Sequence, residues 1–334
     1  MSNKYIVPIG VLIAAVLIIV GGFMVLNPHQ PGSSGIGDNI NDNESYVEPT
    51  QNFIPDVKVQ AGELKRNADL QLKIGNRYKY EYKFTFPLNL TMGFAAEDAN
   101  KSNIPNTNMK MSGSADIVVN RKERYNKSDV YVLKYTSIIK IENFEELMAA
   151  DKKGKEVTQQ EIQQMNMFKE GINTSGETWI NNDGKTVKTI TKMFGMEMTM
   201  EGEKAESGSM MGGVSPSMMI QPWMLALNEN FEWRKETTTN MSGMSSKSTE
   251  KYKVTGVGEI DTKVGKKKCY IVEQESASSM DMSDMSGKSG GTTNTKISAK
   301  SISWVGYNDR ILVKTESWME NLKLGNIELV DEKI

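Results

Sequence analysis

Residues 5–26, YIVPIGVLIAAVLIIVGGFMVL, form an apolar run without a charged side chain. A helix rises about 1.5 Å per residue, so this run would span about 33 Å, enough to cross the hydrocarbon core of a bilayer. Pro8 lies near its start, where a helix tolerates proline. The run therefore predicts one transmembrane helix within residues 1–26, with the rest of the chain on one side of a membrane.

We expect this anchor to be retained. A signal peptide has a shorter apolar region of about 7–15 residues that ends at a small-x-small site, whereas this run ends in Gly-Gly-Phe-Met-Val-Leu. Lys4 precedes the run, and several acidic residues follow it before Lys58. Because basic residues favour the cytoplasmic side, we predict a single-pass protein of the cell membrane with a cytoplasmic N-terminus and residues 27–334 outside.

The segment after the anchor is rich in Gly, Pro, Ser, Asn and acidic residues. Residues 27–56 contain few apolar side chains, so burial would not offset the entropy lost on ordering them. We predict a flexible stalk over residues 27–70 and one extracytoplasmic β-rich domain over residues 71–334.

Alternating aromatic and polar residues mark the start of that domain. In RYKYEYKFTF, residues 77–86, every second residue is aromatic, which is typical of a strand with one buried face. Similar patterns predict strands at 115–120, 129–135, 178–181, 185–191, 196–201, 231–237, 251–256, 269–273, 297–305 and 311–317. Helical patterns are few and short, at 143–150, 158–170 and 216–227.

Two parts of the domain resemble each other. TWIN at 178–181 followed by GKTVKT at 184–189 matches SWVG at 303–306 followed by RILVKT at 310–315. Each part reads as a tryptophan-containing strand, a hairpin turn and a second strand. The similarity predicts two related halves, at about 75–205 and 228–320, that extend one antiparallel sheet. Chance similarity between strands is the alternative.

Two segments of the second half resemble β-rich extracytoplasmic proteins of the lipoprotein-carrier type. They are YKVTGVGEIDTKVGKKKCYIVE at 252–273 and ISWVGYNDRILVKTES at 302–317. The strand–turn–strand text at 178–201 is similar to another part of that group, and the resemblance covers roughly residues 75–320. It implies a mainly β fold with a few short helices: a strongly curved antiparallel sheet, or half-barrel, with helices covering its concave face. Some members hold acyl chains there.

A group of apolar residues forms the candidate ligand site. Methionine adapts to irregular shapes, and four residues of one strand region share a face with period two. Together with a tryptophan from the helical segment they predict a lining for an apolar ligand or lipid: Phe194, Met196, Met198, Met200 and Trp223. The same pattern also fits the ordinary core face of a strand.

Methionines also occur in polar segments, where an apolar side chain is unexpected. Met280, Met282 and Met285 lie in SSMDMSDMSGKSGG, and Met241 and Met244 lie in NMSGMSSKS. Thioethers are soft ligands that suit Cu(I) or Ag(I), and antiparallel pairing could bring the two clusters together. The alternative is polar hairpin ends whose methionines pack at the rim of the sheet.

Composition argues against several classes of protein. The net charge of −2 predicts no broad basic surface for nucleic acid. The single histidine, His29, lies in the predicted stalk, and the single cysteine, Cys269, begins an apolar strand, so no Ser–His–Asp, Cys–His or zinc set is formed. We expect a non-enzymatic surface protein without a cofactor that binds an apolar ligand or lipid. A copper-binding envelope protein and a purely structural envelope protein are the alternatives.

Overall fold

The computed structural model describes residues 56–87, 108–147, 169–193, 195–208, 214–241, 244–281, 294–319 and 322–333. No helix within these ranges is long and apolar enough to cross a membrane. The predicted anchor and the first part of the predicted stalk lie outside the described residues. So does most of the helix predicted at 158–170.

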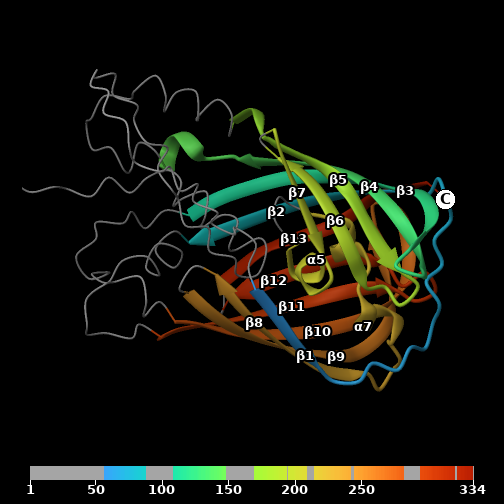
Figure 1. The fold of residues 1–334 in the computed structure, drawn as a ribbon. Coiled ribbons are helices and arrows are strands. Elements are labelled where there is room, and N and C mark those ends of the chain that lie inside the picture. The colour runs from blue at the N-terminus through green and yellow to red at the C-terminus, as the bar shows by residue number, and fades with distance from the viewer. Residues whose placement is uncertain are drawn as a thin grey trace, which may run out of the picture.

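One antiparallel sheet of thirteen strands contains most of the described residues (Figure 1). The strands are β1 (Asp56–Ala61), β2 (Arg77–Pro87), β3 (Asn108–Tyr125), β4 (Ser128–Ile141), β5 (Ile172–Asn181), β6 (Thr186–Met193), β7 (Met196–Glu201), β8 (Glu232–Met241), β9 (Met244–Thr262), β10 (Gly265–Asp281), β11 (Asn294–Gly306), β12 (Leu312–Met319) and β13 (Leu322–Lys333). Their order across the sheet is β1-β8-β9-β10-β11-β12-β13-β2-β3-β4-β5-β6-β7. The sheet is therefore two consecutive meanders, the first from β2 to β7 and the second from β8 to β13, joined where β13 pairs with β2.

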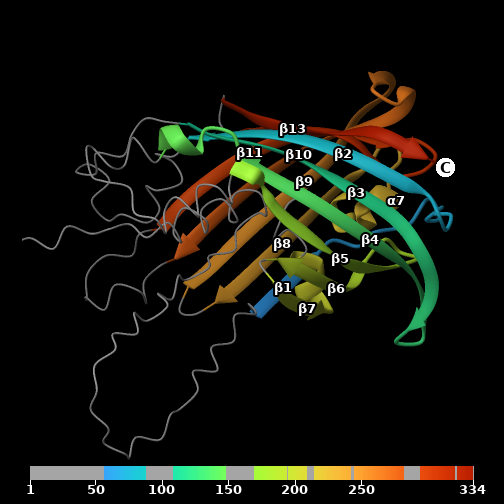
Figure 2. The same ribbon diagram turned by 90° about the horizontal axis from the view of Figure 1, so that it is seen from above.

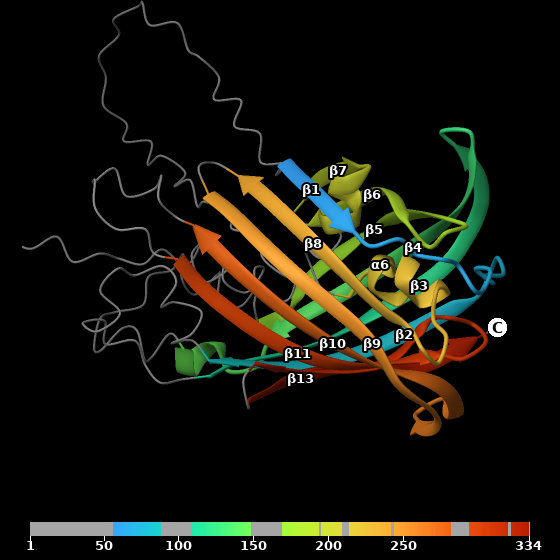
Figure 3. The same cartoon turned by 90° about the horizontal axis from the view of Figure 1, so that it is seen from below.

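The sheet curves strongly around an interior (Figure 2). Figure 3 shows β1 and β8 to β11 side by side along one flank. The edge strands β1 and β7 are not paired with each other in the described part of the chain. Helix α5 (Glu203–Gly208) contacts β1, β6 and β7, so it lies at the gap between the two edges.

Two glycines allow tyrosine rings to cross the strands on the concave side. Tyr82 pairs with Gly113, and its hydroxyl donates to the Ile138 carbonyl oxygen at 2.8 Å, one strand further on. Tyr135 lies across Gly176 in the same way and hydrogen-bonds the Thr191 side chain at 2.8 Å. A Cβ on Gly113 or Gly176 would meet a backbone oxygen of the next strand at 2.1 or 2.0 Å. Strands can approach this closely only without a side chain, which favours tight coiling of the sheet.

The interior is filled by a short segment between β7 and β8. It contains α6 (Pro216–Met219) and α7 (Pro222–Leu225), each of which begins at a proline, where the missing N–H costs nothing. The predicted helix at 216–227 is thus two helical turns, because Pro222 restarts it. α6 lies against β4, β5 and β12, so it bridges the two meanders. Asn67, from the connection after β1, donates from its side chain to the Ala226 carbonyl at 2.7 Å and ties α7 to the wall.

Most predicted strands are confirmed, and several are longer than expected. The alternation at 77–86 is confirmed in detail, because Tyr78, Tyr80 and Tyr82 are buried while the residues between them are exposed. The stalk boundary at residue 70 is wrong: Asp56–Ala61 pairs with β8, and Leu70 is buried in the core. Strand β13 was not predicted either.

The two tryptophan-containing segments that resemble each other in sequence also form similar hairpins. Trp179 pairs with Lys188 between β5 and β6, and Trp304 pairs with Lys314 between β11 and β12. In both hairpins the lysine Nζ lies 5.2 Å from the tryptophan ring centre, and the register shifts directly after the tryptophan. These equivalences support the prediction of two related halves, which remains a prediction.

Candidate functional site

A cavity of about 310 Å³ lies between the α6–α7 segment and the concave face of the second meander. Its volume is at the lower end of the range for small-molecule sites. Residues from β2, β6, β8 to β13 and the α6–α7 segment line it, so both meanders contribute. The walls differ in chemistry: one is aromatic and the other carries hydroxyls.

The aromatic wall is built around Tyr252 of β9. The ring of Tyr252 lies 4.9 Å from Trp223 of α7 and 5.3 Å from Trp233 of β8, centre to centre. The two indole N–H groups donate to Gln221 Oε1 at 2.5 Å and to the Gly62 carbonyl at 2.8 Å. Because their polar atoms are satisfied, these rings present a fixed apolar surface.

The adjoining wall, on the same sheet as Tyr252, consists of inward-facing hydroxyl and amide side chains on β9 to β12. They are Ser248, Gln274, Ser276, Ser278, Ser301, Ser303, Thr315 and Ser317. A chain of hydrogen bonds crosses this wall: Ser301 donates to Gln274 at 3.3 Å, and Gln274 donates to the Tyr252 hydroxyl at 3.2 Å. Tyr252 in turn donates to Glu250. The wall offers donors and acceptors to the polar part of a ligand.

The predicted ligand residues are only partly at this cavity. Trp223 lines it, but the methionines of β7 do not. Met196 is 58% exposed at the end of an edge strand, Met198 packs against the core, and Met200 is buried in it. Phe194 lies outside the described residues. Along β7 this methionine face runs from the exposed Met196 to the buried Met200, and Met198 packs against the core cluster rather than the cavity.

Three of the five predicted metal residues lie at the ends of neighbouring strands. Met241 pairs with Met244 across the β8–β9 hairpin, and Met280 pairs with Ser246. Directly paired residues share a face and the side-chain period is two, so Met241, Met244 and Met280 occupy positions on one face of the sheet. Met282 and Met285 lie outside the described residues. The described ranges contain no group of three His, Cys, Asp or Glu residues that could hold a metal.

Cys269 is fully buried on β10, as expected from its strand. Burial, and then the charge of Asp309, raise the pKa of its thiol to about 12. Nearby, Lys267 forms an ion pair with Glu332 at 2.5 Å, and both side chains are largely buried. Burial lowers the pKa of Lys267, but the hydrogen bond to Glu332 and the charge of Asp309 outweigh it, so the net shift is upward. The Lys267–Glu332 ion pair joins β10 to the end of β13, and the raised pKa keeps the buried Cys269 thiol protonated near neutral pH.

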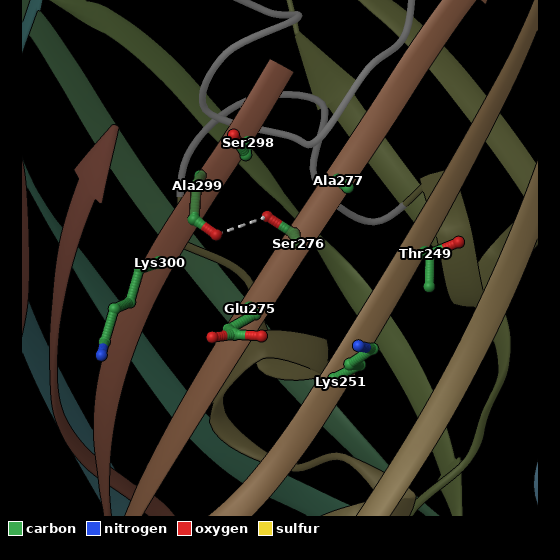
Figure 4. Close-up of a pocket in the computed structure, with 8 residues that line it drawn as sticks. All are labelled: Thr249, Lys251, Glu275, Ser276, Ala277, Ser298, Ala299 and Lys300. Atoms are coloured by element: carbon green, nitrogen blue, oxygen red, sulfur yellow. Dashed lines mark hydrogen bonds between the residues drawn. The ribbon is translucent and has the colours of Figure 1, made fainter. Parts of the chain in front are cut away.

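A second, open pocket of about 320 Å³ lies across β9, β10 and β11 (Figure 4). Lys251 and Lys300 pair with Glu275 from either side, and Ala277 lies in the next row. Glu275 and Ala277 alternate along β10 with the residues of the cavity wall, so they lie on the outer face. This pocket is shallow, charged and exposed.

No protein-family description and no curated protein matches the chain. Three solved structures are similar to it. A candidate exported protein with a YmcC-like fold from Bacteroides fragilis is 10% identical, with a TM-score of 0.34 over 80% of this chain and 99% of that one. A candidate lipoprotein from Parabacteroides distasonis is 9% identical, with a TM-score of 0.36 over 80% and 100%. The hypothetical lipoprotein YmcC from Escherichia coli is 6% identical, with a TM-score of 0.28 over 77% and 85%.

Similarities this low establish neither a family nor a function for this chain, and none of the three proteins is described as a lipoprotein carrier. The fold and the cavity by themselves define a mainly β protein. Its single curved sheet holds a cavity with one aromatic and one hydroxyl-bearing wall.

Proposed function

We propose that this chain is a membrane-anchored, extracytoplasmic binding protein without catalytic activity, which holds an amphipathic ligand such as a lipid inside its curved sheet. The observation that carries this proposal is the cavity with two chemically different walls. Its aromatic wall centres on Tyr252, Trp223 and Trp233, and its hydroxyl wall lies across β9 to β12.

The two walls favour an amphipathic ligand over a purely aliphatic one. An aliphatic ligand would strip water from the hydroxyls of Ser276, Ser301 and their neighbours without replacing those hydrogen bonds, which costs free energy. A purely polar ligand would gain nothing from Phe84, Phe86 and Trp223. A ligand with an apolar body against the rings and a polar group on the hydroxyl wall satisfies both.

Mass spectrometry of small molecules that co-purify with the full chain from membranes tests this proposal. The matched variants are Ser276→Phe and Ala277→Phe, adjacent residues of β10 whose side chains alternate between the faces of the sheet: Ser276 lines the cavity, and Ala277 lines only the outer pocket. Ser276→Phe places a ring in the cavity and should reduce the bound amphiphile several-fold. Ala277→Phe adds the same ring to the outer face and should leave it unchanged. Absence of any bound amphiphile from the unaltered protein, or equal loss in both variants, would refute the proposal.

The methionine positions favour a second candidate, a soft-metal site for Cu(I) or Ag(I). Met241 pairs with Met244, and Met280 pairs with Ser246 two residues further along β9, so the register brings three methionine positions to adjacent strand ends. Titration of the full chain with Ag(I) should then show stoichiometric binding that Met→Leu changes at these three positions abolish. Met196→Leu with Met198→Leu is the control, because it removes thioethers from another strand. Equal binding by both variants would exclude the site.

A further inference from the structure

The turn between β11 and β12 departs in two ways from its counterpart between β5 and β6. The backbones correspond: the N–H of Gly184 donates to the Asn181 carbonyl oxygen, and the N–H of Arg310 donates to that of Gly306. Between these residues the first turn has Asn-Asp, whereas the second has Tyr-Asn-Asp. The second turn therefore contains one additional residue, Tyr307, and has an arginine where the first has a glycine.

Arg310 adopts a backbone conformation that favours glycine. The φ angle is +58° at Arg310 and +74° at Gly184. Both values lie in the left-handed region, which glycine enters without a steric penalty and arginine does not. Glycine would thus form this turn with less strain, so the geometry of the turn does not explain the arginine.

The guanidinium of Arg310 is buried and lacks most of its partners. The residue is 7% exposed, and its Nη2 donates to the Tyr270 hydroxyl at 3.4 Å. The Nε and Nη1 atoms are buried without a hydrogen-bond partner among the described residues. The carboxylate of the adjacent Asp309 lies 3.5 Å from Lys267 Nζ instead. Because a guanidinium keeps its charge and has five N–H donors, burying it in this state costs free energy.

A stacked pair of tyrosines holds this guanidinium and a second cation. The rings of Tyr270 and Tyr307 lie 4.8 Å apart with an interplanar angle of 12°. Arg310 Cζ is 4.5 Å from the centre of the Tyr270 ring, and Lys268 Nζ is 4.2 Å from that of Tyr307. Lys268 and Glu259, which are opposite each other in the register, are both exposed and form no ion pair in the described part of the chain. Two positive charges therefore lie on one tyrosine pair, and the buried one has no counter-ion among the described residues.

We propose that Arg310 is the receptor for an oxyanion, a phosphate or carboxylate group, at the turn between β11 and β12. A planar guanidinium binds such groups through parallel N–H···O bonds, which would satisfy the unpartnered donors. The exposed Lys268 adds a second positive charge on the solvent side, which favours the approach of an anion. Neither Arg310 nor Tyr270 lines the cavity, so this site is separate from it and does not rest on a ligand there.

Urea unfolding of the full chain in detergent tests this inference. Arg310→Gly removes the guanidinium and supplies the residue that the first turn has at this position, so the left-handed conformation is kept without strain. Lys251→Met is the matched control, because it removes an exposed cation from the outer pocket. Midpoints are measured in inorganic phosphate, in acetate and in a short-chain phosphatidic acid, each against chloride at equal ionic strength.

An anion that binds only the folded chain stabilises it progressively with concentration. At ten times its dissociation constant it should raise the folding equilibrium constant of the unaltered chain and of Lys251→Met about tenfold, and leave Arg310→Gly unchanged. A shift with inorganic phosphate or acetate identifies a free oxyanion, and a shift with phosphatidic acid alone identifies a lipid headgroup. Equal shifts in Arg310→Gly and the unaltered chain, or no shift with any of the three, would overturn the proposal.

Discussion

Replacement of Gly176 by alanine gives the sharpest test of how the sheet achieves its curvature. An ideal Cβ at Gly176 would lie 2.0 Å from the Ile190 carbonyl oxygen and 2.9 Å from Cε1 of Tyr135. The oxygen belongs to the backbone of β6, which is paired on both sides, with β5 and β7. It cannot move by the required distance without disturbing two ladders.

The expected loss follows from three contributions. Forcing a methyl group into a packed site costs about 1–3 kcal/mol. Displacement of Tyr135 also weakens its 2.8 Å hydrogen bond to Thr191, worth about 1 kcal/mol. Against these, alanine reduces the conformational freedom of the unfolded chain and returns about 0.5–1 kcal/mol. The net expectation is a loss of about 1–3.5 kcal/mol, and each kcal/mol lowers Tm by roughly 2–4 °C for a domain of this size.

Gly258→Ala is the matched control. Gly258 also lies within a strand, but the nearest atom to its ideal Cβ is Ile271 Cδ1 at 4.0 Å. This variant should be neutral or gain up to about 0.5 kcal/mol. Urea unfolding monitored by tryptophan fluorescence measures the stability of both variants. The urea midpoints are compared, provided that the dependence of the free energy on urea concentration is the same in both. If Gly176→Ala were as stable as Gly258→Ala, the close strand approach and the curvature argument built on it would be wrong.

Three further outcomes are expected. Lys267→Met should lower the free energy of unfolding by about 3 kcal/mol, because Glu332 is left as a buried, unpaired carboxylate. Urea unfolding should show a smaller loss in the double variant Lys267→Met/Glu332→Leu, which would demonstrate that the two side chains interact. Burial raises the pKa of Cys269 from 9.0 to about 12 and the pKa of Tyr82 from 10.0 to about 12. These groups therefore lose their protons at lower pH in the unfolded chain than in the folded one, so stability falls as the pH rises from 9 to 12. Unfolding midpoints measured over this pH range should fall less steeply in Cys269→Ala. Lys188→Ala and Lys314→Ala should each cost about 0.5–1 kcal/mol through loss of the cation–π contact, and clearly unequal losses would argue against equivalent halves.

Alternation of apolar and polar residues predicted the strands that have one buried face and one exposed face. Tyr78, Tyr80 and Tyr82 alternate with charged residues, and the structure buries each of them. Strand β13 escaped prediction because its buried residues change phase: Leu324 and Ile327 are three positions apart, across Gly325. Strand β1, DVKVQA, has only six residues, so its alternation of apolar and polar residues is too short to mark a strand reliably. It pairs with β8, which is far away in the sequence.

Of the described residues that the sequence assigned to a ligand site, Trp223 lies at the cavity and the β7 methionines do not. The methionine face of β7 is apolar and periodic, yet β7 is an edge strand, so its burial declines from Met200 to the exposed Met196. The hydroxyl wall was missed because hydropathy does not alternate there. In EQESAS at 273–278, inward Gln274, Ser276 and Ser278 alternate with outward residues that are equally polar or small. The usable signal was alternation of hydroxyl or amide groups with charge, rather than of apolar with polar residues.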